Sequence, residues 1–197
     1  MATNASPPTL STLPTLPIPP DIAKKLREKY GELVVIAGEA CYENPNLYID
    51  RVTNNYGRIK QGFVIQVYKK TKTMSGLFDV ITTLLLLPNT KVGLGDAHVF
   101  TITGTRFSQI YPDRKCRAEY ATVLSNDYHG IVCNQAMSIY SRDFIYQIGE
   151  TVKPVYSFCD QECFAPGILA LGAPRYEPCE SGVHFFLCRK DAETFTI

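Results

Sequence analysis

Apolar residues recur every four positions over residues 21–30, a spacing that places them on one face of a helix. That face consists of Ile22, Leu26 and Tyr30. Asp21 is placed to cap the start of the helix, and Gly31 is placed to end it. The short apolar run 33–37 follows and is typical of a buried strand. The pattern therefore predicts a short helix that lies on a sheet.

Further along the chain, β-branched and aromatic residues gather in short runs separated by polar or glycine-bearing turns. Such runs are typical of strands. They cover residues 62–69, 77–87, 98–104, 119–124, 139–148 and 183–187. An antiparallel meander is the simplest arrangement for the first three runs. Residues 189–195 carry the pattern of a terminal helix or turn.

These elements predict a single domain behind a tail. Residues 1–20 combine frequent prolines with small polar residues and lack apolar periodicity, which predicts a disordered tail. This tail is either a linker or a Pro-rich peptide that docks on a partner. Residues 21–197 are enough for one domain with its own core. We expect the α+β class, mainly antiparallel β-sheet with a short N-terminal helix and a C-terminal helical turn.

Composition and charge exclude several functional classes. The chain is 45% apolar and 20% charged, as globular proteins are. Twenty basic and nineteen acidic side chains leave a net charge of +1, so no overall field favours nucleic acid or an anionic membrane. The apolar stretch 77–87 is too short to span a bilayer, and the N-terminus lacks the layout of a signal peptide. We therefore expect a cytoplasmic protein that binds no nucleic acid and has no membrane span.

The seven cysteines are an odd number and accompany no export signal, which predicts reduced thiols. The candidate zinc ligands in the C-terminal third are Cys159, Cys163, Cys179, His184 and Cys188. Their spacing is less regular than in standard zinc sites, so a zinc-stabilised module and buried apolar cysteines both stay open. A nucleophilic pair of Cys179 with His184 would need a third group to orient the imidazole. We expect no other cofactor.

One dense basic cluster stands out in the sequence, and it comprises Arg114, Lys115, Cys116 and Arg117. It either holds a phosphate or carboxylate or forms a solvated turn between strands. His184 alternates with aromatic residues on the predicted strand 183–187, where a local hydrogen bond satisfies it or where it lines a ligand site. None of the common phosphate-binding, dinucleotide-binding, zinc-protease or hydrolase motifs is present, so an enzyme is the less favoured interpretation.

Several segments between residues 60 and 195 together resemble a known family. They are Gly62-Phe63 with Tyr68-Lys69-Lys70, Leu86-Leu87-Pro88 with Lys91-Val92, Lys115-Cys116-Arg117-Ala118 with Ala121 and Val123-Leu124, and Cys179-x-x-Gly182-Val183-His184-Phe185-Phe186 with Ala192. In this order they are similar to the domain of unknown function that accompanies pentapeptide repeats in proteins of large DNA viruses and phages. This chain itself carries no pentapeptide repeats and has an insert around residues 163–178.

The resemblance implies a viral source, with the protein in the host cytoplasm or the virion, and it implies no activity. In that family the Lys-Cys-Arg-Ala segment begins a strand, and the segment around the histidine precedes a short helix. Both features agree with the elements predicted above.

Two functional hypotheses follow. The first is a non-enzymatic module that binds other proteins, either viral structural proteins or a second copy of itself, with the tail as a tether. The alternative is a ligand-binding or enzymatic domain whose pocket gathers the polar residues of the two motifs, which are Cys116, Arg117, Cys179 and His184. The zinc-stabilised module is a third possibility.

Overall fold

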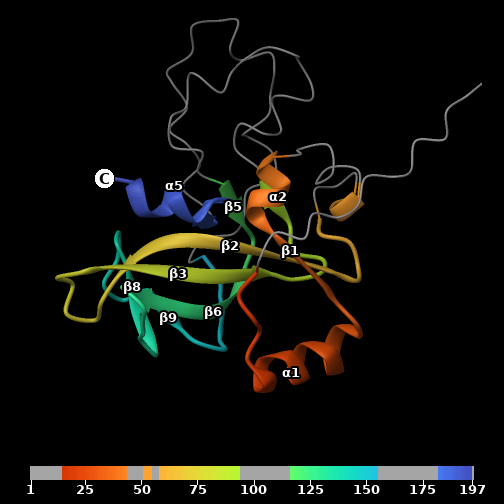
Figure 1. Cartoon of the computed structure of the whole chain (residues 1–197), viewed down its shortest axis with the longest axis horizontal. Coiled ribbons are helices and arrows are strands. Elements are labelled where there is room, and N and C mark those ends of the chain that lie inside the picture. The colour runs from red at the N-terminus through yellow and green to blue at the C-terminus, as the bar shows by residue number, and fades with distance from the viewer. Residues whose placement is uncertain (1–14, 44–50, 55–57, 94–115, 155–181, 197) are drawn as a thin grey trace, which may run out of the picture.

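The computed structural model describes residues 15–43, 51–54, 58–93, 116–154 and 182–196. Its helices are α1 (Pro20–Tyr30), α2 (Gly38–Glu43) and α5 (Arg189–Thr194). Its strands are β1 (Val34–Ala37), β2 (Phe63–Lys72), β3 (Asp79–Leu86), β4 (Val92–Gly93), β5 (Cys116–Ala118), β6 (Ala121–Tyr128), β7 (Ile131–Val132), β8 (Gln135–Ser138), β9 (Ile145–Gln147), β10 (Thr151–Val152) and β11 (Val183–Phe185). Strands dominate (Figure 1), so the predicted α+β class is confirmed.

The main sheet has the order β10-β6-β3-β2-β8-β9, with β1 added to β2 and β7 added to β6. Its pairs are antiparallel except that of β1 with β2. A smaller sheet has the order β11-β5-β4. The hairpin of β2 and β3 follows the predicted meander, but the next strand on β3 is β6, and the run predicted at 98–104 lies outside the described residues.

Three separate segments share the edge of β2 that faces away from β3. β1 pairs in parallel from Phe63, and β8 pairs with the far end at Thr71. Between them Tyr68 exchanges two backbone hydrogen bonds with Phe186, of 2.9 and 2.7 Å. Because all three segments satisfy backbone groups of β2, this central strand holds together parts of the chain that are far apart in sequence.

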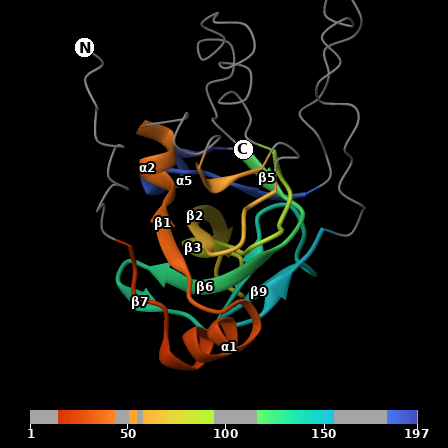
Figure 2. The same cartoon turned by 90° about the vertical axis from the view of Figure 1, so that its right-hand side faces the viewer.

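The predicted helix face packs as the periodicity requires. Ile22 and Leu26 of α1 lie against Val64 of β2, Leu85 of β3 and Leu124 of β6. Figures 1 and 2 show α1 below the strands, with α2 and α5 above them.

A larger apolar core includes residues from β1, β2, β3, β6, β9 and β11, and most of its members have almost no exposed surface. Among the described residues, no helix is long and apolar enough to cross a membrane.

The N-terminal boundary differs in detail from the prediction. The N-cap position is Pro19 and no side chain caps the helix, so Asp21 lies inside the first turn, where a negative charge is still favourable. The sequence predicts residues 15–20 as part of the tail, yet the backbone of Leu16 exchanges two hydrogen bonds with the buried side chain of Gln66, of 2.8 and 3.1 Å. The ordered part of the chain therefore begins before residue 21. Residues 1–14 lie outside the described residues.

Candidate functional site

The two sequence motifs come together in the smaller sheet. β5 pairs with β11 in antiparallel register, and this register places Arg117 opposite His184 and Cys116 opposite Phe185. Directly opposed residues on an antiparallel pair point to the same side of the sheet. Arg117 and His184 therefore share one side, as a pocket built from both motifs requires.

The surroundings of this pair are mostly buried. Arg117 is 8% exposed and lies on a strand, so its interpretation as part of a solvated turn is wrong. Lys69 of β2 is 5% exposed, and its Nζ donates a hydrogen bond of 3.0 Å to the backbone oxygen of His184. The same Nζ lies 5.7 Å from the ring centre of Tyr146. Arg114 and Lys115 lie outside the described residues, and ligand binding at this place stays a prediction.

The zinc hypothesis also stays a prediction. Cys159, Cys163 and Cys179 lie outside the described residues. His184 is on β11, and Cys188 is the N-cap residue of α5. In the part of the chain that the structure describes, no three His, Cys, Asp or Glu side chains gather as metal ligands.

Cys41 of α2 and Cys116 of β5 are buried in the main core, and neither is part of a disulfide. Burial, with smaller contributions from the nearby Cys116 and Glu39, raises the pKa of Cys41 to about 12. Cys41 therefore stays a neutral thiol at physiological pH. Because the thiolate is the nucleophilic form, a catalytic role for Cys41 is disfavoured.

This burial predicts unequal alkylation of the thiols. We expect iodoacetamide to label Cys133, which is partly exposed, at least about tenfold faster than Cys41 in the native protein. Peptide mass spectrometry after timed labelling measures both sites in one sample, and labelling in urea is the control in which both should react. Equal rates in the native protein would show that Cys41 is not protected by the core.

Arg189, the first residue of α5, joins three elements. Its guanidinium pairs with Asp127 of β6 and, at 2.8 Å, with Glu193, while its backbone N–H donates to Glu39 of α2 at 3.2 Å. Burial opposes ionisation of Asp127, but hydrogen bonds from Arg189 and the Gly130 N–H outweigh it and lower the pKa of this carboxyl. This pairing therefore contributes stability above the pKa of an unfolded aspartate, and the contribution is lost as the pH falls through the lower, folded value. We therefore assign Arg189 a structural role, since its contacts join α5 to β6 and α2.

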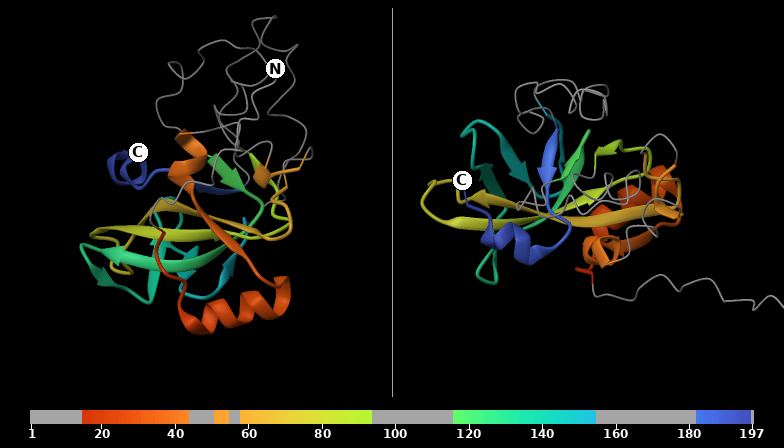
Figure 3. Two further views of the ribbon diagram at one scale, coloured as in Figure 1. Left: turned by 45° about the vertical axis from the view of Figure 1, so that its right-hand side comes forward. Right: turned by 90° about the horizontal axis from the view of Figure 1, so that it is seen from above.

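Large apolar side chains are exposed at one end of the main sheet. They are Met74, Leu77, Phe78, Ile131 and Val132, with exposed fractions of 49%, 74%, 50%, 63% and 65%. The first three belong to the turn between β2 and β3, and the last two form β7. We call these five residues the apolar tip. Figures 1 and 3 show the β2–β3 hairpin extending beyond the helices at this end.

The two parts of the apolar tip are in contact through Tyr128. The ring of Phe78 lies 5.4 Å from the ring of Tyr128, centre to centre. Tyr128 is paired with Ile131 across β6 and β7, so both side chains lie on the same side of the sheet. Phe78, Tyr128 and Ile131 therefore form one surface.

The β2–β3 turn has a defined conformation. A backbone hydrogen bond of 2.9 Å from Thr73 to Phe78 closes it, and Gly76 adopts a φ of +78°, which favours glycine. Leu77 and Phe78 were predicted as the start of a strand, but β3 begins at Asp79 because the turn extends to Phe78. That error explains why the sequence did not reveal the apolar tip. Its only signal was the position of two large apolar residues next to Ser75-Gly76, a turn-forming pair.

A comparison with known protein families gives a match. The model of a family of unknown function, DUF5758, matches residues 55–192, which include every strand from β2 to β11. No curated protein and no solved structure matches the chain. The chain belongs to this family. The family match agrees with the predicted resemblance to a domain of unknown function, and it carries no link to pentapeptide repeats or to viruses.

Proposed function

We propose that this member of the family of unknown function is a non-enzymatic protein-binding module whose partner contacts the apolar tip. One observation carries the proposal, namely five large apolar side chains that are 49–74% exposed on two adjoining hairpins. Single exposed apolar residues are ordinary on protein surfaces, but a contiguous group, here Phe78 and Ile131 joined by Tyr128, is typical of an interaction surface.

The chemistry of the apolar tip suits a protein partner. Phe78 and Met74, and the adjoining Tyr128, are of types that are enriched in protein interfaces, and aromatic residues often contribute most of the binding energy. The closed turn and the paired strand β7 hold these side chains in place before binding, which lowers the entropy cost of association.

Charged residues border the apolar tip. Lys72 and Lys70 each lie 3.1 Å from the carboxylate of Asp79, immediately beside the exposed ring of Phe78 in sequence. Burial opposes ionisation of Asp79, but hydrogen bonds from these two lysines outweigh it and lower its pKa. An apolar centre with a charged border is the usual anatomy of a protein interface.

A narrower form of the proposal names the partner as a viral structural protein or a second copy of this chain. The protein would then act in the host cytoplasm or in the virion. Residues 1–14, the part of the predicted Pro-rich tail that precedes the contact of Leu16 with Gln66, would serve as its tether.

A comparison of purified complexes tests the proposal. Tagged full-length protein is purified from the cells that naturally make it, and co-purifying proteins are quantified by mass spectrometry. We expect the double variant Leu77→Ser, Ile131→Ser to retain at least about tenfold less of a specific partner, because loss of buried apolar contacts at an interface centre costs more than about 1.4 kcal/mol. Since both side chains are exposed, the free energy of unfolding should change by less than about 1 kcal/mol.

Val34→Ser is the matched control. Val34 is also 50% exposed, but it lies on β1, which pairs with the opposite end of β2. The control should keep the partner at the wild-type level. If the double variant keeps every partner that the control keeps, the apolar tip is not the binding surface.

A further inference from the structure

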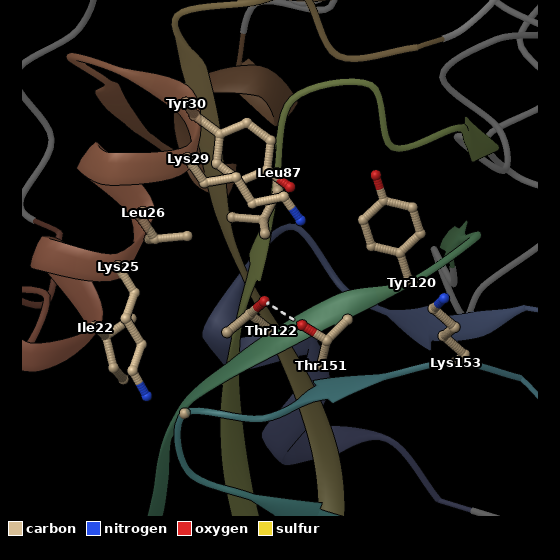
Figure 4. A pocket seen from close by; sticks show the side chains of 11 residues that line it. Ile22, Lys25, Leu26, Lys29, Tyr30, Leu87, Tyr120, Thr122, Thr151 and Lys153 are labelled. Carbon is tan, nitrogen blue, oxygen red and sulfur yellow. Dashed lines mark hydrogen bonds between the residues drawn. The ribbon is translucent and has the colours of Figure 1, made fainter.

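A cavity of about 480 Å³ lies between α1 and the strands β6 and β10, far along β6 from the apolar tip. Ile22, Leu26 and Leu87 supply its apolar part, and each of them is at most 7% exposed. Figure 4 shows α1 on one side of the cavity and β6 with β10 on the other. The volume is within the range of about 300–1,000 Å³ that is usual for small-molecule sites.

All the charged residues that line the cavity are positively charged lysines. Lys25 and Lys29 of α1 and Lys153, which follows β10, all line it, and none of its eleven lining residues is acidic. In the described residues none of these three lysines takes part in an ion pair, whereas Lys24 on the same helix pairs with Glu28 at 4.0 Å. Three lysines therefore line the cavity, and its own walls supply no countercharge.

Two of these lysines repel each other on α1. Lys25 and Lys29 are four residues apart and lie on one face, where like charges destabilise a helix by about 0.2–0.5 kcal/mol. The neighbouring pair Lys24 and Glu28 has the same spacing with opposite charges, which is favourable. An anion bound between the lysines would remove this repulsion.

Polar and aromatic groups complete the site. The hydroxyl oxygens of Thr122 and Thr151 lie 3.0 Å apart, so one hydroxyl donates to the other and one proton remains for a ligand. Tyr120 lies on the same wall, with Lys153 Nζ 6.0 Å from its ring centre. The cavity thus offers positive charge, a hydroxyl donor and an apolar surface in one place.

We propose that this cavity binds a small organic phosphate monoester. Its phosphate would lie among Lys25, Lys29 and Lys153, and its apolar or aromatic part would contact Leu26 and Leu87. A monoester carries a charge of about −1.5 to −2 at neutral pH, which suits several lysines better than a single carboxylate does. The proposal is independent of protein binding at the apolar tip.

Isothermal titration calorimetry of the full-length protein with 1-naphthyl phosphate tests the site. We expect it to bind at least about tenfold more tightly than inorganic phosphate, which lacks the apolar part, and than 1-naphthol, which lacks the charge. Lys25→Gln, Lys29→Gln and Lys153→Gln should each weaken binding at least about threefold. All three side chains lie on exposed residues, so these variants should fold.

Lys24→Gln is the control, because it removes the same charge from the same helix but does not line the cavity. It should leave binding unchanged. The proposal is overturned if 1-naphthyl phosphate does not bind at millimolar concentration, or if Lys24→Gln weakens binding as much as Lys153→Gln. It is also overturned if 1-naphthol binds as tightly as its phosphate, because the lysines would then play no part.

Discussion

Replacement of Gly38 with alanine is expected to destabilise the protein by about 3 kcal/mol, the upper end of the usual cost of overpacking. A Cβ atom at this position would lie 2.4 Å from the backbone oxygen of Leu187 and 2.9 Å from that of Gln66. Both contacts are to backbone, so no side chain can rotate to make room. The start of α2 would have to move away from β2 and from the segment after β11.

Urea unfolding followed by circular dichroism measures this change. Gly130→Ala is a suitable control, because Gly130 has a φ of +86° but no atom within 4 Å of the added Cβ. Its cost should come from backbone strain alone, about 1 kcal/mol. If Gly38→Ala costs no more than the control, α2 does not pack against Leu187 as closely as described.

Truncation of Phe185 to alanine should cost about 4 kcal/mol, as is usual for a fully buried phenylalanine. Phe185 has no exposed surface and carries β11 into the main core. Its loss leaves a cavity where the smaller sheet meets the larger one. β11 also pairs with β5, and this pairing places Arg117 opposite His184. The variant should therefore also disturb the candidate site formed by the two motifs.

Phe78→Ala is the matched control for this truncation. It removes the same atoms, but Phe78 is 50% exposed, so less than about 1 kcal/mol of stability should be lost. Urea unfolding curves give the loss of stability of each variant from the shift of its midpoint, provided that the slope of the free energy of unfolding against urea concentration is unchanged. Similar losses for the two variants would mean that Phe185 does not join the smaller sheet to the core.

The sequence predicted the elements whose signal is local. The helix α1 was predicted because Ile22 and Leu26 repeat at the helical period. The structure confirms that both side chains are buried. In β11, Val183 and Phe185 are buried while His184 is half-buried, as strand alternation predicts. β8 was missed because Gln135–Ser138 holds no β-branched residue, and its strand conformation depends on pairing with β2 and β9.

The sites depended on information that a single sequence does not hold. The opposition of Arg117 and His184 is set by strand register between segments far apart in the chain, and no local pattern fixes that register. The lysines of the cavity come from α1 and from the end of β10, so their common location also appears only in the fold. The apolar tip was hidden because its residues look like ordinary strand residues until the turn is placed.

Photo-crosslinking from Leu77 tests the central claim most directly. A benzoylphenylalanine at Leu77, the most exposed residue of the apolar tip, is irradiated in the cells that make the protein, with Val34 as the control position. We predict a discrete crosslinked protein from Leu77 and none from Val34; two copies of this chain in the product would identify self-assembly. An uncrosslinked monomer at both positions, or the same products from both, would contradict a protein-binding role for the apolar tip.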